Sequence, residues 1–190
     1  DRDDAARVLA AQASFPLVRG VRHKPGRGAM RTARWREGYA LLQRHGLHFE
    51  LQAPWNELYD AADLASAFPR TTLVLNHAGL PAERSAEGLA GWRAALRALA
   101  GCPNACVKIS GLGIRGRPWR VADQAPVVLD TIAIFGTARC MFASNFPVDS
   151  LAGSYATIMN GWRDIVAHLP QADQRALFWE NAHRVYRIGG

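Results

Sequence analysis

His77 is the residue of this sequence whose setting points most directly to chemistry. It follows the apolar run Leu73, Val74 and Leu75, with Asn76 between, and a glycine turn begins just after it. A short strand that is apolar on both faces is typical of a parallel sheet covered on each side. Barrels built from such strands place their chemistry at the carboxyl ends, where an imidazole can bind a metal, polarise a carbonyl or accept a proton. The alternative is a histidine that only caps the following loop.

Polar side chains also stand at the carboxyl ends of four other apolar segments. They are Arg22, His23 and Lys24, then Gln52, then Lys108 and Ser110, then Ser144 and Asn145, with Asp149 just beyond. Buried polar groups cost free energy unless they are paired or hold a ligand. Polar residues gathered at one end of several apolar strands therefore predict a binding site where those ends meet.

Four members of this set can be interpreted individually. The Arg22 guanidinium is a planar fork that matches a substrate carboxylate. Lys108 is a lone ammonium in an apolar segment, and burial would lower its pKa. A salt bridge with a carboxylate at the end of a neighbouring strand is the alternative for Lys108. Gln52, like His23, is expected to orient the substrate.

Asn145 and Asp149 bear on the identity of a catalytic base. The Asn145 carboxamide can orient a water or a carbonyl, but it cannot take a proton at neutral pH. Either the Asp149 carboxylate or the His77 imidazole is therefore expected to act as the base. Asp149 has an equally weighted alternative as the N-cap of the helix after Leu151.

The elements that must position these residues alternate along the chain. Five short segments bounded by Gly, Pro or Asn predict strands, at residues 17–23, 48–52, 73–77, 105–110 and 140–145. Stretches with helical spacing lie between and after them, at residues 35–45, 58–68, 89–100, 125–135 and 155–169. This alternation predicts an α/β fold with parallel strands and right-handed helical crossovers. Residues 178–186 predict two closing helical turns, with Asn181 as their N-cap.

Length and composition bound the fold class. The 190 residues, 49% of them apolar, predict one domain over residues 1–190 with a sizeable core. Five strands cannot close an eight-stranded barrel, which typically takes about 250 residues, so we expect an incomplete barrel. We find no stretch of about 20 apolar residues and no signal-peptide pattern, and the three cysteines lack a zinc-ligand spacing. We therefore expect a cytoplasmic protein with no membrane partner.

The net charge of +7 raises the question of nucleic acid. The basic residues are nearly all arginines, and they are scattered through helical stretches without interleaved aromatics. A solvated surface is the favoured interpretation, and no nucleic-acid partner is expected. Some arginines remain available for an anionic substrate.

Taken together, five motifs in order along the chain resemble the amidohydrolase-2 family. They lie at residues 20–23, 49–52, 75–81, 107–112 and 141–149, and residues 180–186 are similar to that family's last helix. The resemblance covers essentially the entire chain. It implies part of a (β/α)8 TIM barrel of the lactonase-like branch of the amidohydrolase superfamily.

The resemblance also implies features that this sequence lacks. Family members begin with a strand that carries a metal-binding His-x-His pair, and this chain has none in such a setting. Because residue 1 is Asp and not Met, we expect the first two or three βα units to lie upstream of Asp1. The family pattern implies a divalent metal, zinc first, with His77 as a ligand. Many relatives carry an Asp in the last strand where this chain has Asn145.

The activity implied by the resemblance is hydrolysis of a lactone of a sugar acid or another organic acid. His77, Asn145, Asp149 and Lys108 would then be catalytic, and Arg22, His23, Gln52, Trp55 and Ser110 would bind a small carboxylate-bearing substrate. Trp55, like Trp119, would form an apolar wall, unless it only packs its loop. The alternatives are a decarboxylase, a lactone isomerase, or a non-catalytic partial barrel that packs against a partner or a second copy as a homo-oligomer.

Overall fold

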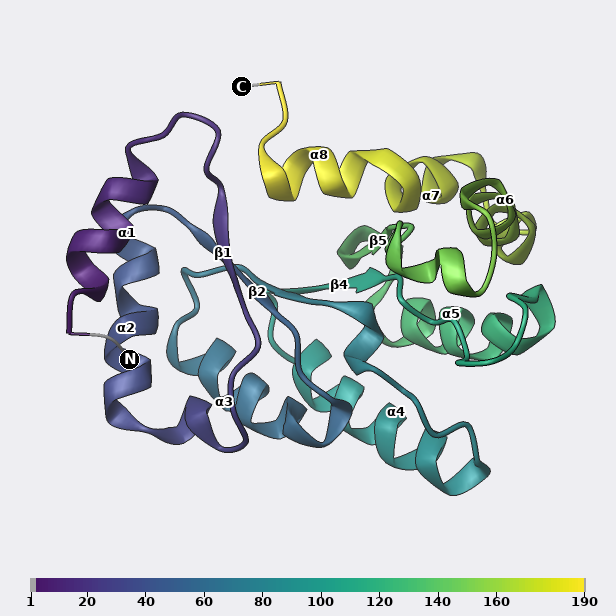
Figure 1. The fold of residues 1–190 in the computed structure, drawn as a ribbon, viewed down its shortest axis with the longest axis horizontal. Coiled ribbons are helices and arrows are strands. Elements are labelled where there is room, and N and C mark those ends of the chain that lie inside the picture. Colours follow the sequence, from purple (N-terminus) through teal and green to yellow (C-terminus); the bar gives the residue numbers. More distant parts are fainter. Residues whose placement is uncertain (1–2, 190) are drawn as a thin grey trace.

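The computed structural model describes residues 3–189 and has a parallel five-stranded sheet at its centre. The strands are β1 (Gly20–His23), β2 (His48–Leu51), β3 (Leu73–Leu75), β4 (Ala105–Ile109) and β5 (Cys140–Phe142). They pair in sequence order, with Arg22 beside Glu50 and Lys108 beside Met141. The α/β fold with parallel strands is therefore confirmed (Figure 1).

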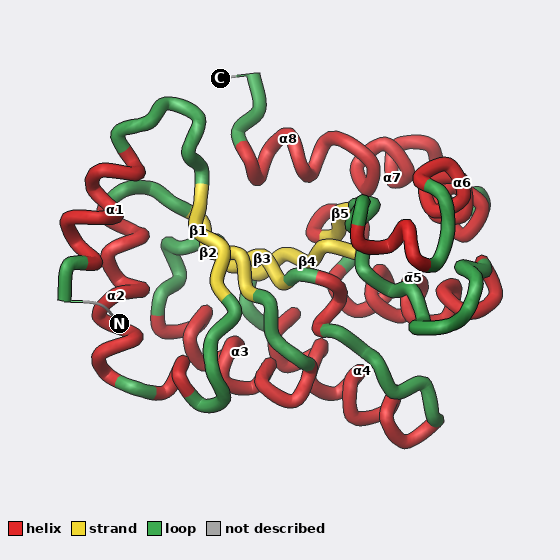
Figure 2. The backbone as a smooth tube through the Cα atoms, viewed as in Figure 1, coloured by secondary structure: helices red, strands yellow, loops and turns green. Residues whose placement is uncertain are grey.

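Helices lie before, between and after the strands. Most of them cover one face of the sheet, and α8 covers the other. Their bounds are α1 Ala5–Ala13, α2 Ala33–Arg44, α3 Leu58–Ala67, α4 Ala86–Ala100, α5 Val121–Phe135, α6 Tyr155–Val166, α7 Gln171–Arg175 and α8 Asn181–Tyr186. Figure 2 shows α3 and α4 below the strands and α8 running above them. None of the described helices is long and apolar enough to cross a membrane.

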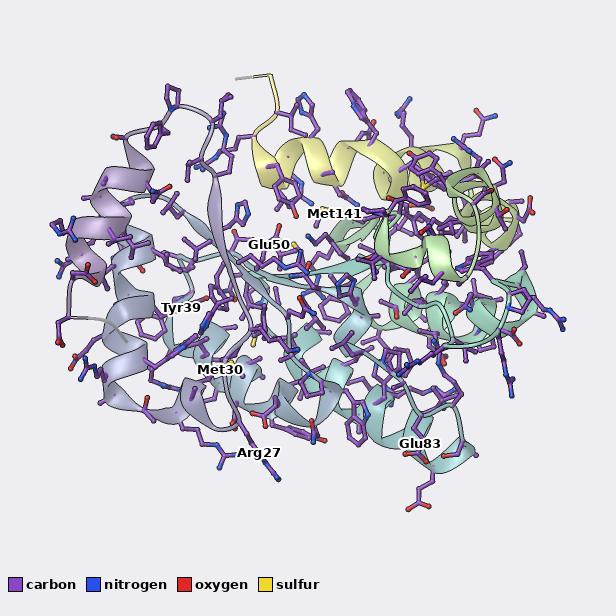
Figure 3. All side chains as sticks on the ribbon, in the orientation of Figure 1. Arg27, Met30, Tyr39, Glu50, Glu83 and Met141 are labelled. Carbon is purple, nitrogen blue, oxygen red and sulfur yellow. The ribbon has the colours of Figure 1, made fainter. Side chains whose placement is uncertain are left out.

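Strand alternation divides the sheet into an outer and an inner face. Successive side chains of a strand point to opposite faces. The outward residues Phe49, Leu75 and Val107 join the main core with side chains of the covering helices, among them Trp92 of α4. The inward residues Val74, Cys106 and Met141 pack instead against Ala182, Val185 and Tyr186 of α8. Glu50 also lies between the sheet and α8, as Figure 3 shows.

Four strands end earlier than the sequence predicts, by one residue in β2 and β4, two in β3 and three in β5, and β1 begins three residues later. The largest differences are at β3, which stops at Leu75, and at β5, which stops at Phe142. His77 has φ of 56° and Asn145 has φ of 53°, which is the left-handed region that extended strands exclude. His77 and Asn145 therefore lie on turns just beyond their strands.

Two predicted helix caps are corrected by the structure. Ser154, not Asp149, caps α6, because its side chain accepts a hydrogen bond from the backbone of Thr157. Asn181 is no N-cap, since the chain is already helical through Glu180 and Asn181. Its Nδ2 instead donates to the carbonyl oxygens of Thr137 at 2.7 Å and Cys140 at 2.8 Å. These two hydrogen bonds connect α8 to the beginning of β5.

Candidate active site

The turn after β3 presents His77 in a strained backbone. His77, Ala78 and Leu80 all have positive φ values, of 56°, 49° and 54°. Each such non-glycine residue costs about 1–3 kcal/mol and persists only where the surrounding structure holds it. Trp92 supplies part of that restraint, because its indole Nε1 donates to the Ala78 carbonyl at 2.7 Å. The turn buries His77 to 7% exposure at the carboxyl edge of the sheet.

Both ring nitrogens of His77 have polar neighbours. Nδ1 lies 2.9 Å from the Ser110 hydroxyl, and Nε2 lies 3.5 Å from Nη2 of Arg22. Arginine can only donate, so Nε2 carries the lone pair and Nδ1 carries the proton that it donates to Ser110. Burial first, and then the charges of Arg22 and Lys108, lower the pKa of His77 to about 4. His77 is therefore neutral at neutral pH.

Arg22 links the first two strands to His77. Its Nη2 donates to Oε1 of Gln52 at 2.7 Å and is the same atom that approaches His77. Arg22 is exposed, so one side of its guanidinium faces solvent. Arg22, Gln52, His77 and Ser110 therefore converge from four consecutive strand ends.

Lys108 does not stand alone, because Glu50 of β2 pairs with it. Lys108 Nζ donates to Oε2 of Glu50 at 2.8 Å, and the Tyr186 hydroxyl donates to Oε1 at 2.5 Å. Asn76 Nδ2 lies 3.5 Å from Oε2. Burial alone would raise the pKa of Glu50, but the bonds from Lys108 and Tyr186 lower it below its ordinary value. The salt-bridge alternative for Lys108 is the one that the geometry supports.

Sequence reasoning missed Glu50, which is the centre of this inner cluster. The available signal was strand alternation: Glu50 lies two residues before Gln52, so the two side chains point to the same face of the sheet. Tyr186 gave no such signal. It lies 136 residues away in the sequence, and only the packing of α8 on the inner face brings it to Glu50.

Asn145 and Asp149 form a second carboxylate position beyond β5. Asn145 Nδ2 donates to Oδ1 of Asp149 at 2.8 Å, while the buried Oδ2 has no partner among the described residues. Burial raises the pKa of Asp149, although the bonds from Asn145 and the Gly113 backbone act against it. A buried carboxylate oxygen without a partner is costly, so Oδ2 is suited to a ligand or a water.

Gly111 lies against both His77 and Asn145, which belong to the two parts of the site described above. It has φ of 61°, and a Cβ there would lie 2.6 Å from Nδ1 of His77 and 3.2 Å from Nδ2 of Asn145. Glycine is therefore required, because any side chain would displace one of these two groups. His77 and Asn145 consequently line the same wall.

His23 and Trp55, which the sequence placed at the substrate, lie elsewhere. His23 follows Arg22 directly, so it faces the outer side of the sheet, where its ring lies 6.3 Å from that of Trp35. Trp55 packs over α4, since a Cβ on Gly91 would lie 2.8 Å from its ring. The loop-packing alternative for Trp55 is the one observed. Trp119 likewise packs on Trp162, with ring centroids 4.9 Å apart.

The residues present do not make a metal site by themselves. Within residues 3–189 there is no group of three or more His, Cys, Asp and Glu side chains that could hold an ion. His77 is the single imidazole of the cluster, and its lone pair at Nε2 faces the Arg22 guanidinium. A cation at that nitrogen would be repelled by Arg22.

Comparison with known proteins points to one family. The sequence model of the amidohydrolase family matches residues 1–188. The uncharacterized protein y4mH of Sinorhizobium fredii is 40% identical over 158 residues, which are 83% of this chain and 53% of that protein. An L-fucono-1,5-lactonase of Burkholderia multivorans is 33% identical over 192 residues, which are 90% of this chain and 63% of that enzyme. The chain thus spans roughly half to two thirds of the length of these curated relatives.

A solved structure shows the same fold. It is an amidohydrolase from Burkholderia multivorans with bound zinc, which is 29% identical and superposes with a TM-score of 0.85. The match covers 98% of this chain and 71% of that one. The five parallel strands are accordingly part of a TIM barrel, and the chain belongs to the amidohydrolase-2 family.

Proposed function

We propose that this chain supplies one side of an active site that hydrolyses the lactone of a carboxylate-bearing sugar acid. The observation that carries the proposal is the neutral His77, held between Arg22 and Ser110 on the same wall as the Asn145–Asp149 pair. The lactonases among the relatives, at 33% and 29% identity, support the choice of reaction.

Arg22 is the group suited to bind the substrate. Among the described residues only its Nη2 is engaged, by Gln52 and His77, so Nη1 and Nε remain for a carboxylate or a lactone carbonyl. The hydrogen bond to Gln52 fixes the plane of the Arg22 guanidinium. Ser110 fixes the ring of His77, so that the Nε2 lone pair stays directed at Arg22 and helps to hold the guanidinium in place.

Asp149 is the group suited to move the proton. Its Oδ2 takes a proton from a water while the water oxygen attacks the lactone carbonyl carbon. The ring C–O bond then breaks, and the same proton passes from Oδ2 to the leaving alkoxide, which gives the open hydroxy acid. Asn145 holds Oδ1 at 2.8 Å and so keeps Oδ2 aimed at the water. Asp149 thus supplies the carboxylate that Asn145 cannot.

Lys108 acts through its charge in this proposal. Glu50 fixes the ammonium in place at 2.8 Å, and the charge of Lys108 helps to keep His77 unprotonated. Zinc as a cofactor and His77 as its ligand remain predictions for the complete protein, and no step proposed above passes through a metal.

The test is turnover of a panel of sugar-acid lactones by the complete protein, followed with a pH indicator. His77→Ala is expected to lower kcat/KM at least about 100-fold, the usual effect of losing a positioned polar group. His168→Ala is the matched control, because His168 is exposed in the turn that follows α6. Full activity of His77→Ala would overturn the site assignment.

Product analysis separates hydrolysis from the other reactions considered for this family. Hydrolysis adds one water and releases one acid equivalent per lactone. Release of carbon dioxide would instead assign a decarboxylase, and an isomer of unchanged mass would assign an isomerase.

A further inference from the structure

The amino ends of the strands carry a pocket, at the opposite end of the sheet from His77. It has a volume of about 430 Å³. His48 begins β2, while Thr72 and Asn104 directly precede β3 and β4, and Val185 of α8 supplies the facing wall. The walls of the pocket therefore come from elements that this chain itself packs together.

Three arginines line this pocket from separate segments. Arg70 lies between α3 and β3, Arg184 lies on α8, and Arg187 directly follows α8. No Asp or Glu is among the lining residues, and within residues 3–189 none of the three arginines forms a salt bridge. Elsewhere the pattern differs, since Arg31 and Arg93 each pair with an aspartate. The pocket thus holds three arginine charges, with no carboxylate among its lining residues.

Two of these arginines are held in place by backbone carbonyl groups. Arg187 donates from Nη1 to the Gly46 carbonyl at 3.0 Å and from Nη2 to the Arg19 carbonyl at 3.4 Å, and Gly46 itself lines the pocket. Arg184 donates from Nη2 to Ala138 at 2.6 Å. These bonds occupy only part of each guanidinium, and they reduce the entropy that would be lost on binding an anion.

The electrostatic environment of two other lining residues agrees with this placement. Burial raises the pKa of the Cys106 thiol, and the charge of Arg184 acts against that rise. Burial lowers the pKa of His48; the Glu50 carboxylate acts against this, and the charge of Arg187 acts in the same direction as burial. Both arginine charges therefore reach groups inside the pocket.

We propose that this pocket binds a phosphate group. A phosphate offers several acceptor oxygens in different directions, which matches guanidinium groups that approach from three segments. The volume exceeds that of one phosphate, so a phosphate ester fits as well as the free ion. This site is independent of the proposed lactonase chemistry, because Arg22 and His77 lie at the other end of the strands.

The experiment is isothermal titration of the complete protein with inorganic phosphate at constant ionic strength. Saturable binding is expected, and Arg70→Gln is expected to weaken it at least about tenfold, the loss typical of one charge-assisted hydrogen bond. Arg97→Gln is the matched control, because Arg97 is exposed on α4 and removes the same charge. The control is expected to change affinity by less than about twofold, because Arg97 does not line the pocket and salt screens its charge from a phosphate bound there.

A second variant and a second ligand complete the design. Arg187→Gln tests the same pocket from α8 should Arg70→Gln fail to fold. Titration with glycerol phosphate tells whether the pocket prefers the ester to the free ion, and binding of either supports the proposal. Absence of saturable binding would overturn it. So would an equal loss in Arg97→Gln, or a loss confined to Arg22→Gln, which would place the phosphate at the His77 end.

Discussion

Two polar clusters of this sheet differ in how completely they are satisfied. Glu50, on the inner face, has hydrogen-bond donors on both carboxylate oxygens, from Lys108 and from Tyr186. Asp149, beyond β5, has a donor on Oδ1 but none on its buried Oδ2 within the described residues. The difference is that the first cluster can support the fold by itself, whereas the second is completed only by a ligand or a water.

The pKa shifts of the two carboxylates express the same contrast. Burial acts to raise both, but the partners of Glu50 overcome it and those of Asp149 do not. A carboxylate with a lowered pKa stabilises the folded state when ionised, and one with a raised pKa does not. Glu50 therefore belongs to the support of the site and Asp149 to its chemistry.

The largest effect expected from this comparison is on activity. Asp149→Asn keeps the shape but removes the proton acceptor, so kcat for lactone hydrolysis should fall by about 100- to 10,000-fold. The free energy of unfolding should change by less than about 1 kcal/mol or increase, because a costly buried charge is removed. Initial rates and urea denaturation of the same preparation measure both. Undiminished turnover in Asp149→Asn would return the base role to His77.

The next effect is on stability. Glu50→Gln leaves the half-buried Lys108 ammonium without a counter-charge, and we expect a loss of about 3 kcal/mol in the free energy of unfolding. Glu180→Gln removes the partner of Arg175 at the surface and is the matched control, with a loss below about 1 kcal/mol. Urea denaturation monitored by tryptophan fluorescence compares the two. Equal losses in both variants would remove the distinction drawn for Glu50.

The smallest effect concerns pH. The pKa of His77 is lowered from 6.5 to about 4, so the unfolded chain binds the proton first as the pH falls. The contribution of neutral His77 is fully present above pH 6.5 and is lost as the pH falls toward 4. Between pH 7 and pH 5 this amounts to about 2 kcal/mol.

Unfolding at these two pH values, in the native chain and in His77→Gln, measures this contribution. The variant should lose less stability on acidification by about that amount, because other groups such as His48 titrate in both proteins. Parallel pH profiles for the two proteins would show that His77 is not held in its neutral form by the fold.

Much of the carboxyl-end arrangement could be predicted from local pattern. Apolar runs that end in Gln52, His77 and Ser110 predicted strand ends, and parallel strands necessarily bring their carboxyl ends to one edge. Lys108 could be recognised as an ammonium in an apolar strand, for which a salt bridge with a carboxylate was one of two expectations. Local pattern was less informative at residue boundaries, since it extended β3 and β5 over residues that turn into left-handed conformations.

Sequence alone thus determined the order and type of the elements, together with the residues that their ends expose, because periodicity and turn chemistry are local properties of the chain. Tertiary structure decided what each face of the sheet meets. Arg22 therefore reaches His77, while the adjacent His23 packs on Trp35. It also decided the pairing of Glu50 with Tyr186 and the burial of Asp149 Oδ2. These depend on long-range packing and on desolvation, which arise only when distant segments exclude water from the same space.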